Sequence, residues 1–436
     1  MSAITGIFYR NGNFVLPEQI RKMNDSLSHR GPDGSGVCFD GTVAFGHQML
    51  HTTQESLQEN LPFKCSDTGL VITSDARIDN RDELASLLGL ENVTAVPDSL
   101  FILKAYKKWG EKCPEKLLGD FAFTIWDPVN ETLFCARDFM GVKPFYYYLS
   151  EEYFVFATEK KALFTIPSVP CKLNKIKLTS FFSYKKTKTT FYEDICILNS
   201  ATSLTIKKDN VRIKKYWEID PELNIVMESD EDYVKAFREI FTEAITCRLR
   251  SVVPIGFELS GGLDSSSIVC MAKSILQASG INDEIDVFSI LFKGFSGGDE
   301  SYYVNRVIDT GGIKPHFVRG DNISPLEGIE EILWYHEQPF PAPFFPIIAK
   351  SYKQVHDHNI RVLLSGWGGD HVVSYGQNYL KELFLTFRWK KLIKEINSKS
   401  KQSNQSFHDI FLMKVLLPLI PIKIRNLAKK YLNRGS

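Results

Sequence analysis

The sequence predicts an α+β domain over residues 1–215 and an α/β domain with a doubly wound parallel sheet over residues 231–436, joined by a connector at 216–230. Three observations support this division. Short alternating apolar runs separated by turn residues fill the first part, which is typical of antiparallel sheets. Strand and helix patterns alternate in the second part, which favours a parallel sheet. A glycine-rich turn at 259–266 joins the first strand of that part to its helix.

Composition narrows the classes of function. The 436 residues carry no formal net charge, so no basic field argues for a nucleic-acid partner. No apolar run is long enough to span a bilayer. The eight cysteines show no CxxC pair and no regular spacing, which favours reduced thiols in the cytoplasm over disulfides or a zinc site.

Each domain has its own set of predicted elements. In the first domain we predict strands at 4–8, 43–49, 70–74, 121–126, 132–135 and 153–157, and helices at 17–28, 81–88 and 99–109. In the second we predict strands at 253–259, 285–292, 315–318 and 360–364, and helices at 230–249, 267–279, 300–309, 323–335 and 345–359. Ligands of such a sheet bind at the carboxyl ends of its strands, so the loops after Leu259, Phe292 and Leu364 should converge.

The turn after the first of these strands reads Leu259-Ser-Gly-Gly-Leu-Asp-Ser-Ser266. Glycine lets the backbone approach a phosphate, and a helix N-terminus favours negative charge. A carboxylate beside phosphate implies a cation between them, and Mg2+ prefers oxygen ligands. We therefore expect a nucleotide contact from eight residues of this domain: Leu259, Ser260, Gly261, Gly262, Asp264, Ser265, Ser266 and, near the end of the next strand, Ile290.

The loop after Leu364 repeats the same chemistry. Ser365-Gly366-Trp-Gly-Gly-Asp370 offers glycines after a strand and then a carboxylate. Two carboxylates can face one triphosphate when a cation screens both. Asp264 and Asp370 are therefore our candidate metal ligands and catalytic residues, and Ser365 and Gly366 are candidate nucleotide contacts.

The order of motifs resembles the asparagine synthetase family, which joins a class II glutamine amidotransferase domain of Ntn-hydrolase-like sandwich fold to an ATP pyrophosphatase domain. The motifs that carry the resemblance are His29–Gly34, Gly46-His47, Asp75–Leu84, Gly119–Phe123, Ala136–Asp138, Gly141–Tyr147 and Phe156–Glu159, followed by the two glycine loops. The resemblance implies ATP and Mg2+ as cofactors.

The departures from the family pattern concern the amidotransferase chemistry. Glutamine-hydrolysing members begin Met-Cys-Gly, whereas this chain begins Met1-Ser2-Ala3, and a hydroxyl is far less acidic than a thiol. Met49 replaces the arginine that clamps the glutamine carboxylate, and Asp75-Ala76 replaces Asn-Gly. Only Asp98 matches. We therefore expect an inactive domain; a serine-based amidase is the alternative.

The second loop also departs from the asparagine-forming pattern, because Trp367 stands where those enzymes place a glutamate and His371 where they have another acid. An enzyme without ammonia supply can activate a carboxylate as its adenylate and let an amine of the substrate attack it. The start of the chain, Arg77–Leu84 and the Trp367 loop look most like the macrolactam synthetases of lasso peptides. That resemblance implies closure of an isopeptide ring between a peptide's N-terminal amine and an Asp or Glu side chain.

Three alternatives remain open: an ammonia-dependent asparagine synthetase, a β-lactam synthetase-like enzyme, and a non-catalytic scaffold. The resemblance implies a ribosomal precursor peptide as substrate, together with a leader peptidase and a leader-binding protein as partners. The basic amphipathic tail from residue 380 is compatible with a membrane surface, although packing within the protein is favoured. For the lysine that family members use during acyl transfer, either Lys414, Lys423 or another local lysine substitutes, a partner supplies it, or the chain is a shortened variant.

Two further acids have open roles. Glu300 belongs to a pair with Asp299 that either binds a cation or caps the following helix. Glu337 either orients the substrate or is a surface acid beside a proline turn.

Overall fold

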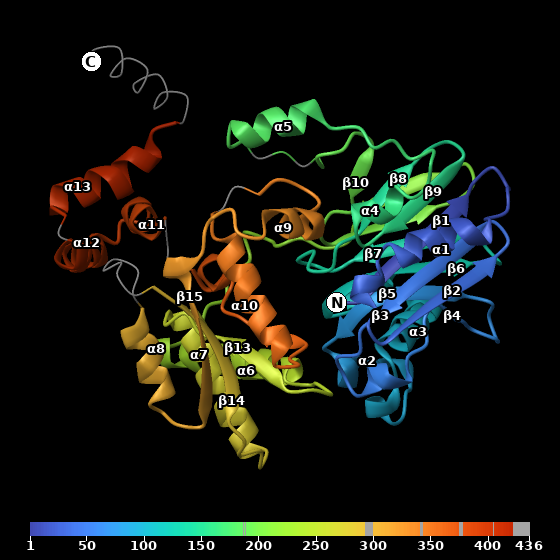
Figure 1. The fold of residues 1–436 in the computed structure, drawn as a ribbon. Helices are drawn as coiled ribbons and strands as arrows, with labels where there is room; N and C mark the ends of the chain where they lie inside the picture. Colours follow the sequence, from blue (N-terminus) through green and yellow to red (C-terminus); the bar gives the residue numbers. More distant parts are fainter. Residues whose placement is uncertain are drawn as a thin grey trace. The chain divides into compact units, whose positions relative to one another are not determined.

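The structure is a computed structural model that describes residues 1–185, 187, 189–292, 300–340, 343–374, 378–403 and 405–421. Its internal contacts divide the chain into two units (Figure 1). The first unit comprises 1–262 with 266–364, and the second comprises 263–265 with 365–436. The first unit contains the predicted α+β domain and the parallel sheet.

The α+β domain contains two six-stranded antiparallel sheets. The first has the order β10-β8-β9-β1-β3-β2, built from β1 (Ala3–Tyr9), β2 (Gly34–Asp40), β3 (Val43–Met49), β8 (Tyr146–Leu149), β9 (Tyr153–Ala157) and β10 (Ile195–Ile197). The second has the order β12-β11-β7-β6-β5-β4, built from β4 (Phe63–Lys64), β5 (Val71–Ile78), β6 (Gly119–Asp127), β7 (Thr132–Arg137), β11 (Thr202–Ile206) and β12 (Val211–Lys215).

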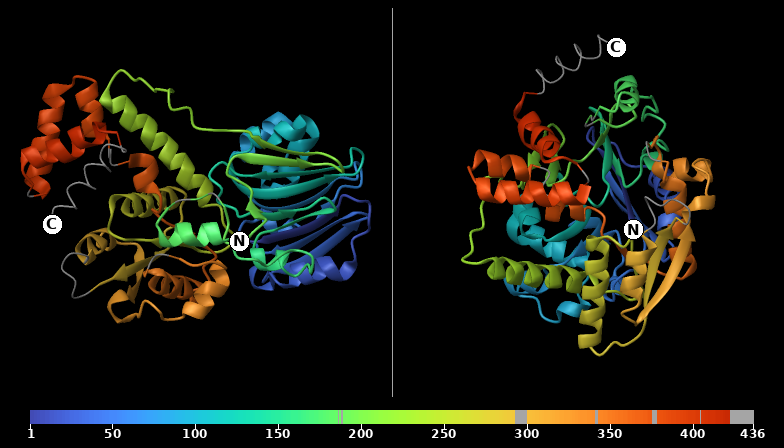
Figure 2. Two further views of the ribbon diagram at one scale, coloured as in Figure 1. Left: turned by 90° about the horizontal axis from the view of Figure 1, so that it is seen from above. Right: turned by 90° about the vertical axis from the view of Figure 1, so that its left-hand side faces the viewer.

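The two sheets pack face to face, as Figure 2 shows, and helices cover both outer faces. The layer between the sheets is aromatic: Phe8 of the first sheet meets Trp126 of the second with ring centroids 5.3 Å apart, and Phe45 and Phe156 belong to the same cluster. The helices of the outer faces are α1 (Pro17–Asp25) and α4 (Lys160–Leu163) on the first sheet, and α2 (Arg81–Leu88) and α3 (Asp98–Trp109) on the second. This αββα sandwich confirms the predicted fold class. Helix α5 (Lys175–Phe182) lies between β9 and β10 in the chain.

A parallel four-stranded sheet forms the rest of the first unit, with the order β15-β14-β13-β16. Its elements are α6 (Asp230–Arg248), β13 (Ile255–Glu258), α7 (Leu263–Ala278), β14 (Ile285–Leu291), α8 (Ser301–Ile308), β15 (Ile313–Arg319), α9 (Ile329–His336), α10 (Phe345–Asp357) and β16 (Val362–Leu364). After β13 the chain adds β14 and then β15 along one edge of the sheet, and β16 then pairs with the opposite edge of β13. The strand order therefore reverses between β13 and β16, and ligands bind at such a switch point.

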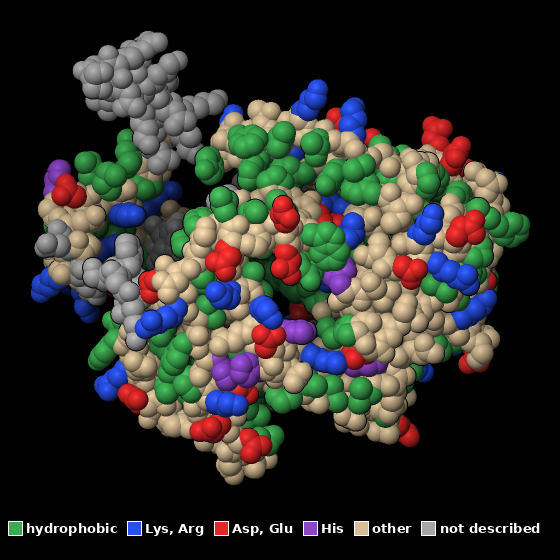
Figure 3. All heavy atoms as spheres, in the orientation of Figure 1, with side chains coloured by type: hydrophobic (Ala, Val, Ile, Leu, Met, Phe, Trp, Pro, Cys, Tyr) green, Lys and Arg blue, Asp and Glu red, His purple; other side chains and the backbone are tan. Residues whose placement is uncertain are grey.

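The second unit contains a small helical cluster with its own core. Its helices are α11 (Tyr379–Leu385), α12 (Trp389–Ser403) and α13 (Phe407–Phe411). Leu383, Leu392, Ile396, Ile410 and Val415 are almost fully buried in it. Across the described residues, no helix is both long and apolar enough to cross a bilayer. Basic and acidic side chains are interspersed on the face drawn in Figure 3.

Most predicted elements are present, and the differences have local causes. The predicted helix at 323–335 begins only at Ile329, because Gly328 has a positive φ of 66° and Pro325 precedes it. The helix predicted at 267–279 begins earlier, at Leu263, directly after the second glycine of the loop. Strands β2, β4, β8, β10, β11 and β12 were not predicted.

We predict that Phe156→Ala destabilises the sandwich strongly. Its ring is fully buried, stacks on Phe145 at 5.2 Å and fills the space above Gly6, where a Cβ atom would lie 2.2 Å from it. A cavity of this kind lowers the free energy of unfolding by roughly 3–5 kcal/mol. Urea denaturation followed by tryptophan fluorescence measures the change. The exposed Phe14→Ala is the control and should leave the midpoint unchanged.

Candidate functional site

The first glycine loop leaves the carboxyl end of β13 and enters α7. Leu259 is buried, its side chain lies in the core, and its N–H donates to the carbonyl of Phe288 at 2.9 Å. Gly261 has a φ of 88°, and a Cβ atom there would lie 3.0 Å from Cβ of Tyr303. Its conformation and its close packing on Tyr303 both favour glycine.

Hydroxyl groups stabilise this turn. The N–H of Gly262 donates to Ser260 Oγ at 3.3 Å, and Gly262 is the N-cap of α7. The N–H of Ser266 donates to the carbonyl of Gly262. The first turn of α7 therefore starts inside the motif, which gives the loop the helix N-terminus that phosphate binding needs.

The second glycine loop packs directly on Asp264. A Cβ atom at Gly369 would lie 2.4 Å from Cγ of Asp264, and one at Gly366 would lie 2.7 Å from the backbone nitrogen of Ser265. Any side chain at these two positions would displace the carboxylate or the loop. The glycines of one motif thus form a cradle for the aspartate of the other.

The donor set of this cradle fits a divalent cation with a triphosphate. Asp370 begins the short π-helical turn Asp370–Ser374, five residues after Ser365. In the part of the chain that the structure describes, no group of three or more His, Cys, Asp or Glu side chains is placed to hold a metal. Mg2+ commonly takes one or two carboxylates and completes its shell with phosphate and water oxygens, so Asp264 and Asp370 remain our candidate ligands.

The other predicted contacts are distributed around these loops. The Oγ of Ser365 accepts from the N–H of Trp367 at 3.3 Å, so its hydroxyl shapes the second loop. Ile290 packs in a cluster with Val318, Ile323 and Ile347 on the neighbouring strand and helices. The indole of Trp367 is 93 % exposed, which places a large apolar surface on the loop itself.

The two acids with open roles have different environments. Glu300 lies beside Gly261, with its carbonyl 3.2 Å from the position of a Cβ there; Asp299 lies outside the described residues. Glu337 is not a surface acid. Its carboxylate accepts from the backbone N–H groups of Lys160 at 2.7 Å and Lys161 at 2.5 Å, the first two residues of α4. It joins the parallel-sheet domain to the α+β domain.

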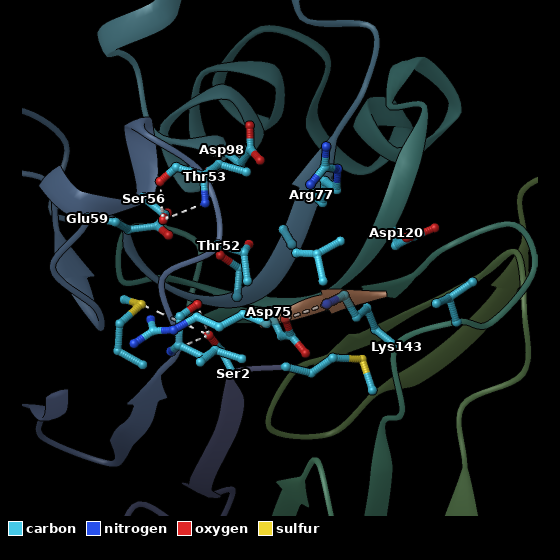
Figure 4. A pocket seen from close by; sticks show the side chains of 18 of the residues that line it. Ser2, Thr52, Thr53, Ser56, Glu59, Asp75, Arg77, Asp98, Asp120 and Lys143 are labelled. Carbon is cyan, nitrogen blue, oxygen red and sulfur yellow. Dashed lines mark hydrogen bonds and ion pairs between the residues drawn. The ribbon is translucent and has the colours of Figure 1, made fainter. Parts of the chain in front are cut away.

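A cavity of about 280 Å3 lies at the position of the amidotransferase residues, and its lining also includes Arg248 and residues 361–364 of the parallel-sheet domain (Figure 4). Ser2 Oγ accepts from the N–H of Leu50 at 3.0 Å. Asp75 is almost fully buried and pairs with Lys143 at 2.7 Å, while its second carboxylate oxygen has no hydrogen-bond partner. A carboxylate at this position repels the negative charge that develops on a carbonyl oxygen during amide cleavage.

The residue at the amine-binding position of this cavity, Asp98, matches the family but is already paired. Asp98 is buried and engaged by Arg81, and it accepts from the N–H of Ile78 at 3.1 Å. Burial raises the pKa of Asp98 to about 6, although Arg81 and Arg250 oppose the rise. Burial also lowers the pKa of the Met1 α-amine to about 5, and Asp75 opposes that decrease. Among the lining residues, Asp75 thus pairs with Lys143 and Arg248 with Asp120, while Asp98 is held by Arg81 from outside the lining.

The sequence reasoning missed the residues that join the two domains. Arg361 of the parallel-sheet domain binds Asp33, and Arg248 binds Asp79 and Asp120. Asp33 belongs to the recognised motif His29–Gly34, but neither charge pattern nor spacing identifies its partner more than 300 residues later.

Comparison with known proteins agrees with this architecture. The glutamine amidotransferase domain model matches residues 1–217, and the asparagine synthase model matches residues 236–419. A putative glutamine-hydrolysing asparagine synthetase 2 of Methanocaldococcus jannaschii is 29 % identical over 95 % of this chain and 84 % of its own length. Glutamine-hydrolysing asparagine synthetase 3 of Bacillus subtilis is 30 % identical over 72 % of this chain. An amidase, chyE, of Penicillium rubens is 27 % identical over 82 % of this chain.

The chain belongs to the asparagine synthetase family, a family of ATP-dependent, amide-forming ligases. It spans only 54 % and 55 % of the Bacillus and Penicillium relatives. The family accounts for both the αββα sandwich and the parallel sheet with two glycine loops.

We predict that Gly369→Ala weakens binding of Mg-ATP by roughly tenfold to hundredfold, because the added methyl group displaces the Asp264 carboxylate. Asp264→Asn should weaken it by a similar factor. Isothermal titration calorimetry with and without Mg2+ measures both. Ser267→Ala, on the exposed face of α7, is the control. Wild-type affinity in Gly369→Ala would contradict the cradle.

Proposed function

We propose that this protein is a lasso-peptide cyclase that uses ATP and Mg2+ to close an isopeptide ring in a ribosomal precursor peptide. The observation that carries the proposal is the combination of an intact nucleotide cradle around Asp264 with a cavity whose amidotransferase groups are replaced or paired. The first favours carboxylate activation. The second argues against ammonia from glutamine, which leaves an amine of the substrate or free ammonium as the nucleophile, and we favour the substrate amine.

The reaction has two steps. An Asp or Glu carboxylate of the peptide attacks the α-phosphorus of ATP, and pyrophosphate leaves. The peptide's N-terminal amine then attacks the acyl carbon of the adenylate, loses a proton and expels AMP. Holding both ends of one chain in place supplies much of the rate, because the second step is intramolecular.

The chain's own residues have distinct roles in this proposal. The loop Ser260–Gly262 and the first turn of α7 bind phosphate oxygens through backbone N–H groups. Asp264 and Asp370 hold Mg2+, which neutralises charge on the phosphates when it is bound. Trp367 presents an apolar face in place of the family's glutamate, so the acceptor side suits an apolar peptide segment better than a charged amino acid.

The second candidate is an ammonia-dependent asparagine synthetase. The Methanocaldococcus and Bacillus relatives are named asparagine synthetases, although both names specify glutamine hydrolysis. The Penicillium relative is named an amidase, so relatives of this chain are not all asparagine synthetases by name. A β-lactam synthetase-like enzyme and a scaffold without turnover are the remaining alternatives. Trp367 argues against asparagine formation, and the cradle argues against a scaffold.

The partners follow from the same chemistry. A free N-terminal amine at the ring position requires removal of a leader, which needs a peptidase and a protein that binds the leader. We place the reaction in the cytoplasm, where the eight cysteines, all unpaired in the structure, remain reduced.

We predict that a precursor peptide encoded beside this gene, with its leader removed, loses one water when it is incubated with the protein and Mg-ATP. AMP and pyrophosphate should form in equal amounts with the cyclic product. Mass spectrometry and nucleotide chromatography measure both products, and Asp264→Ala should abolish them. Formation of asparagine from aspartate and ammonium, with the peptide unchanged, would favour the second candidate. No ATP consumption with either substrate would favour the scaffold.

We also predict that Ser2→Cys does not create a glutaminase. The thiol restores the nucleophile, but Met49 still lacks the charge that clamps a carboxylate, and Asp75 still opposes an oxyanion. Release of glutamate from glutamine should stay at background in the wild type and the variant. Glutamate release by the wild type would support the serine-based amidase instead.

A further inference from the structure

The strands that carry the two glycine loops are both fixed at their amino ends by the same short stretch of the α+β domain. The N–H of Val252, three residues before β13, donates to the carbonyl of Thr52 at 3.0 Å. Arg361, directly before β16, donates to the carbonyl of His51 at 2.9 Å. Two consecutive residues of the first domain therefore hold two neighbouring strands of the second.

Asp33 completes this contact. Its carboxylate accepts from both terminal nitrogens of Arg361, at 2.5 Å and 2.9 Å, and from the N–H of His51 at 2.7 Å. Burial alone would raise the pKa of Asp33, but the hydrogen bonds from Arg361 and His51 hold it below its ordinary value. The carboxylate is thus charged, and a bidentate Arg–carboxylate pair fixes direction as well as distance.

This contact lies at the two strands that lead into the glycine loops, so it can affect the position of those loops. β13 and β16 pair in parallel, with Ile255 opposite Val362 and Phe257 opposite Leu364. β16 has only three residues, so few ladder hydrogen bonds fix its register. Ser365, the first residue of the second glycine loop, follows Leu364 immediately. A shift of β16 along β13 is therefore transmitted to the loop that must approach Asp264.

We propose that Asp33, His51 and Thr52 form a register clamp: the α+β domain positions β13 and β16 so that Gly366 and Gly369 reach Asp264. Arg361 is a positioning residue that acts through β16. The clamp gives a domain without glutaminase chemistry a function in the synthetase reaction. The inference rests on the proposed function only in assigning nucleotide to these loops.

The other contacts between the two domains provide a matched control. Arg248 also reaches across, to Asp79 at 2.9 Å and to Asp120. It is the last residue of α6, and six residues separate it from β13. Arg248→Ala removes a comparable ion pair between the same domains without releasing either strand from the clamp.

The experiment compares four variants of the full chain: Asp33→Ala, Arg361→Ala, the double variant, and Arg248→Ala. We expect each clamp variant to raise the Kd for Mg-ATP about tenfold, and the double variant to raise it by less than the product of the two single effects, because both residues form the same ion pair. The Kd of Arg361→Lys should lie between those of the wild type and Arg361→Ala, since lysine keeps the charge but not the bidentate geometry. Arg248→Ala should bind Mg-ATP like the wild type.

A nucleotide-free measurement separates this inference from the proposed function. Hydrogen–deuterium exchange of the apo protein should accelerate in peptides covering 253–262 and 361–370 in the clamp variants, and not in Arg248→Ala. Thermal unfolding of each variant verifies that it is folded. Unchanged exchange in folded Arg361→Ala, or equal acceleration in Arg248→Ala, overturns the clamp. If exchange accelerates in the clamp variants but the wild-type protein does not bind Mg-ATP, the nucleotide assignment is overturned and the clamp stands.

Discussion

The close approach of Gly366 and Gly369 to Asp264 is the constraint on which the candidate site depends. A carboxylate can help to bind a triphosphate only when a cation lies between them, and a cation needs ligands at fixed distances. Here the position of Asp264 is set by backbone without side chains, because an added methyl group at either glycine would collide with it or its neighbour. Gly366 and Gly369 of the second motif are needed for this close approach, whereas Gly368 has open space around it and a positive φ of 93°.

The α+β domain keeps the family's scaffold while its reactive positions have changed. The aromatic layer between its sheets is complete, and the loop that contains Asp33 is intact. Ser2 stands at the position of the nucleophile, and Met49 stands at the position of the arginine that binds the glutamine carboxylate. The buried Asp75 pairs with Lys143 at 2.7 Å. Residues that bear chemistry have thus diverged, whereas residues that face the neighbouring domain, including Asp33, Asp79 and Asp120, form ion pairs.

Much of the fold could be predicted from sequence, since the patterns that define it are local. The strands at 43–49 and 153–157 and the helix at 81–88 have the predicted bounds, because apolar periodicity and turn residues mark both ends. Edge strands such as β2 and β12 were missed, since their alternation is weak and their outer faces are polar. The chemistry of the two glycine motifs predicts Asp264 and Asp370 as metal ligands, and that assignment stays a prediction. The partners of Asp33 and Glu337 could not be predicted, because their contacts join segments 328 and 177 residues apart.

The most direct test of the central claim is the fate of a carboxylate oxygen. A leader-free precursor peptide labelled with 18O in its Asp and Glu side chains is incubated with the protein and Mg-ATP, and the AMP is analysed by mass spectrometry. Activation as an adenylate, followed by attack of the N-terminal amine, predicts one 18O atom in AMP for each ring that closes. Ring closure with unlabelled AMP, or with ADP and labelled phosphate, would contradict the account.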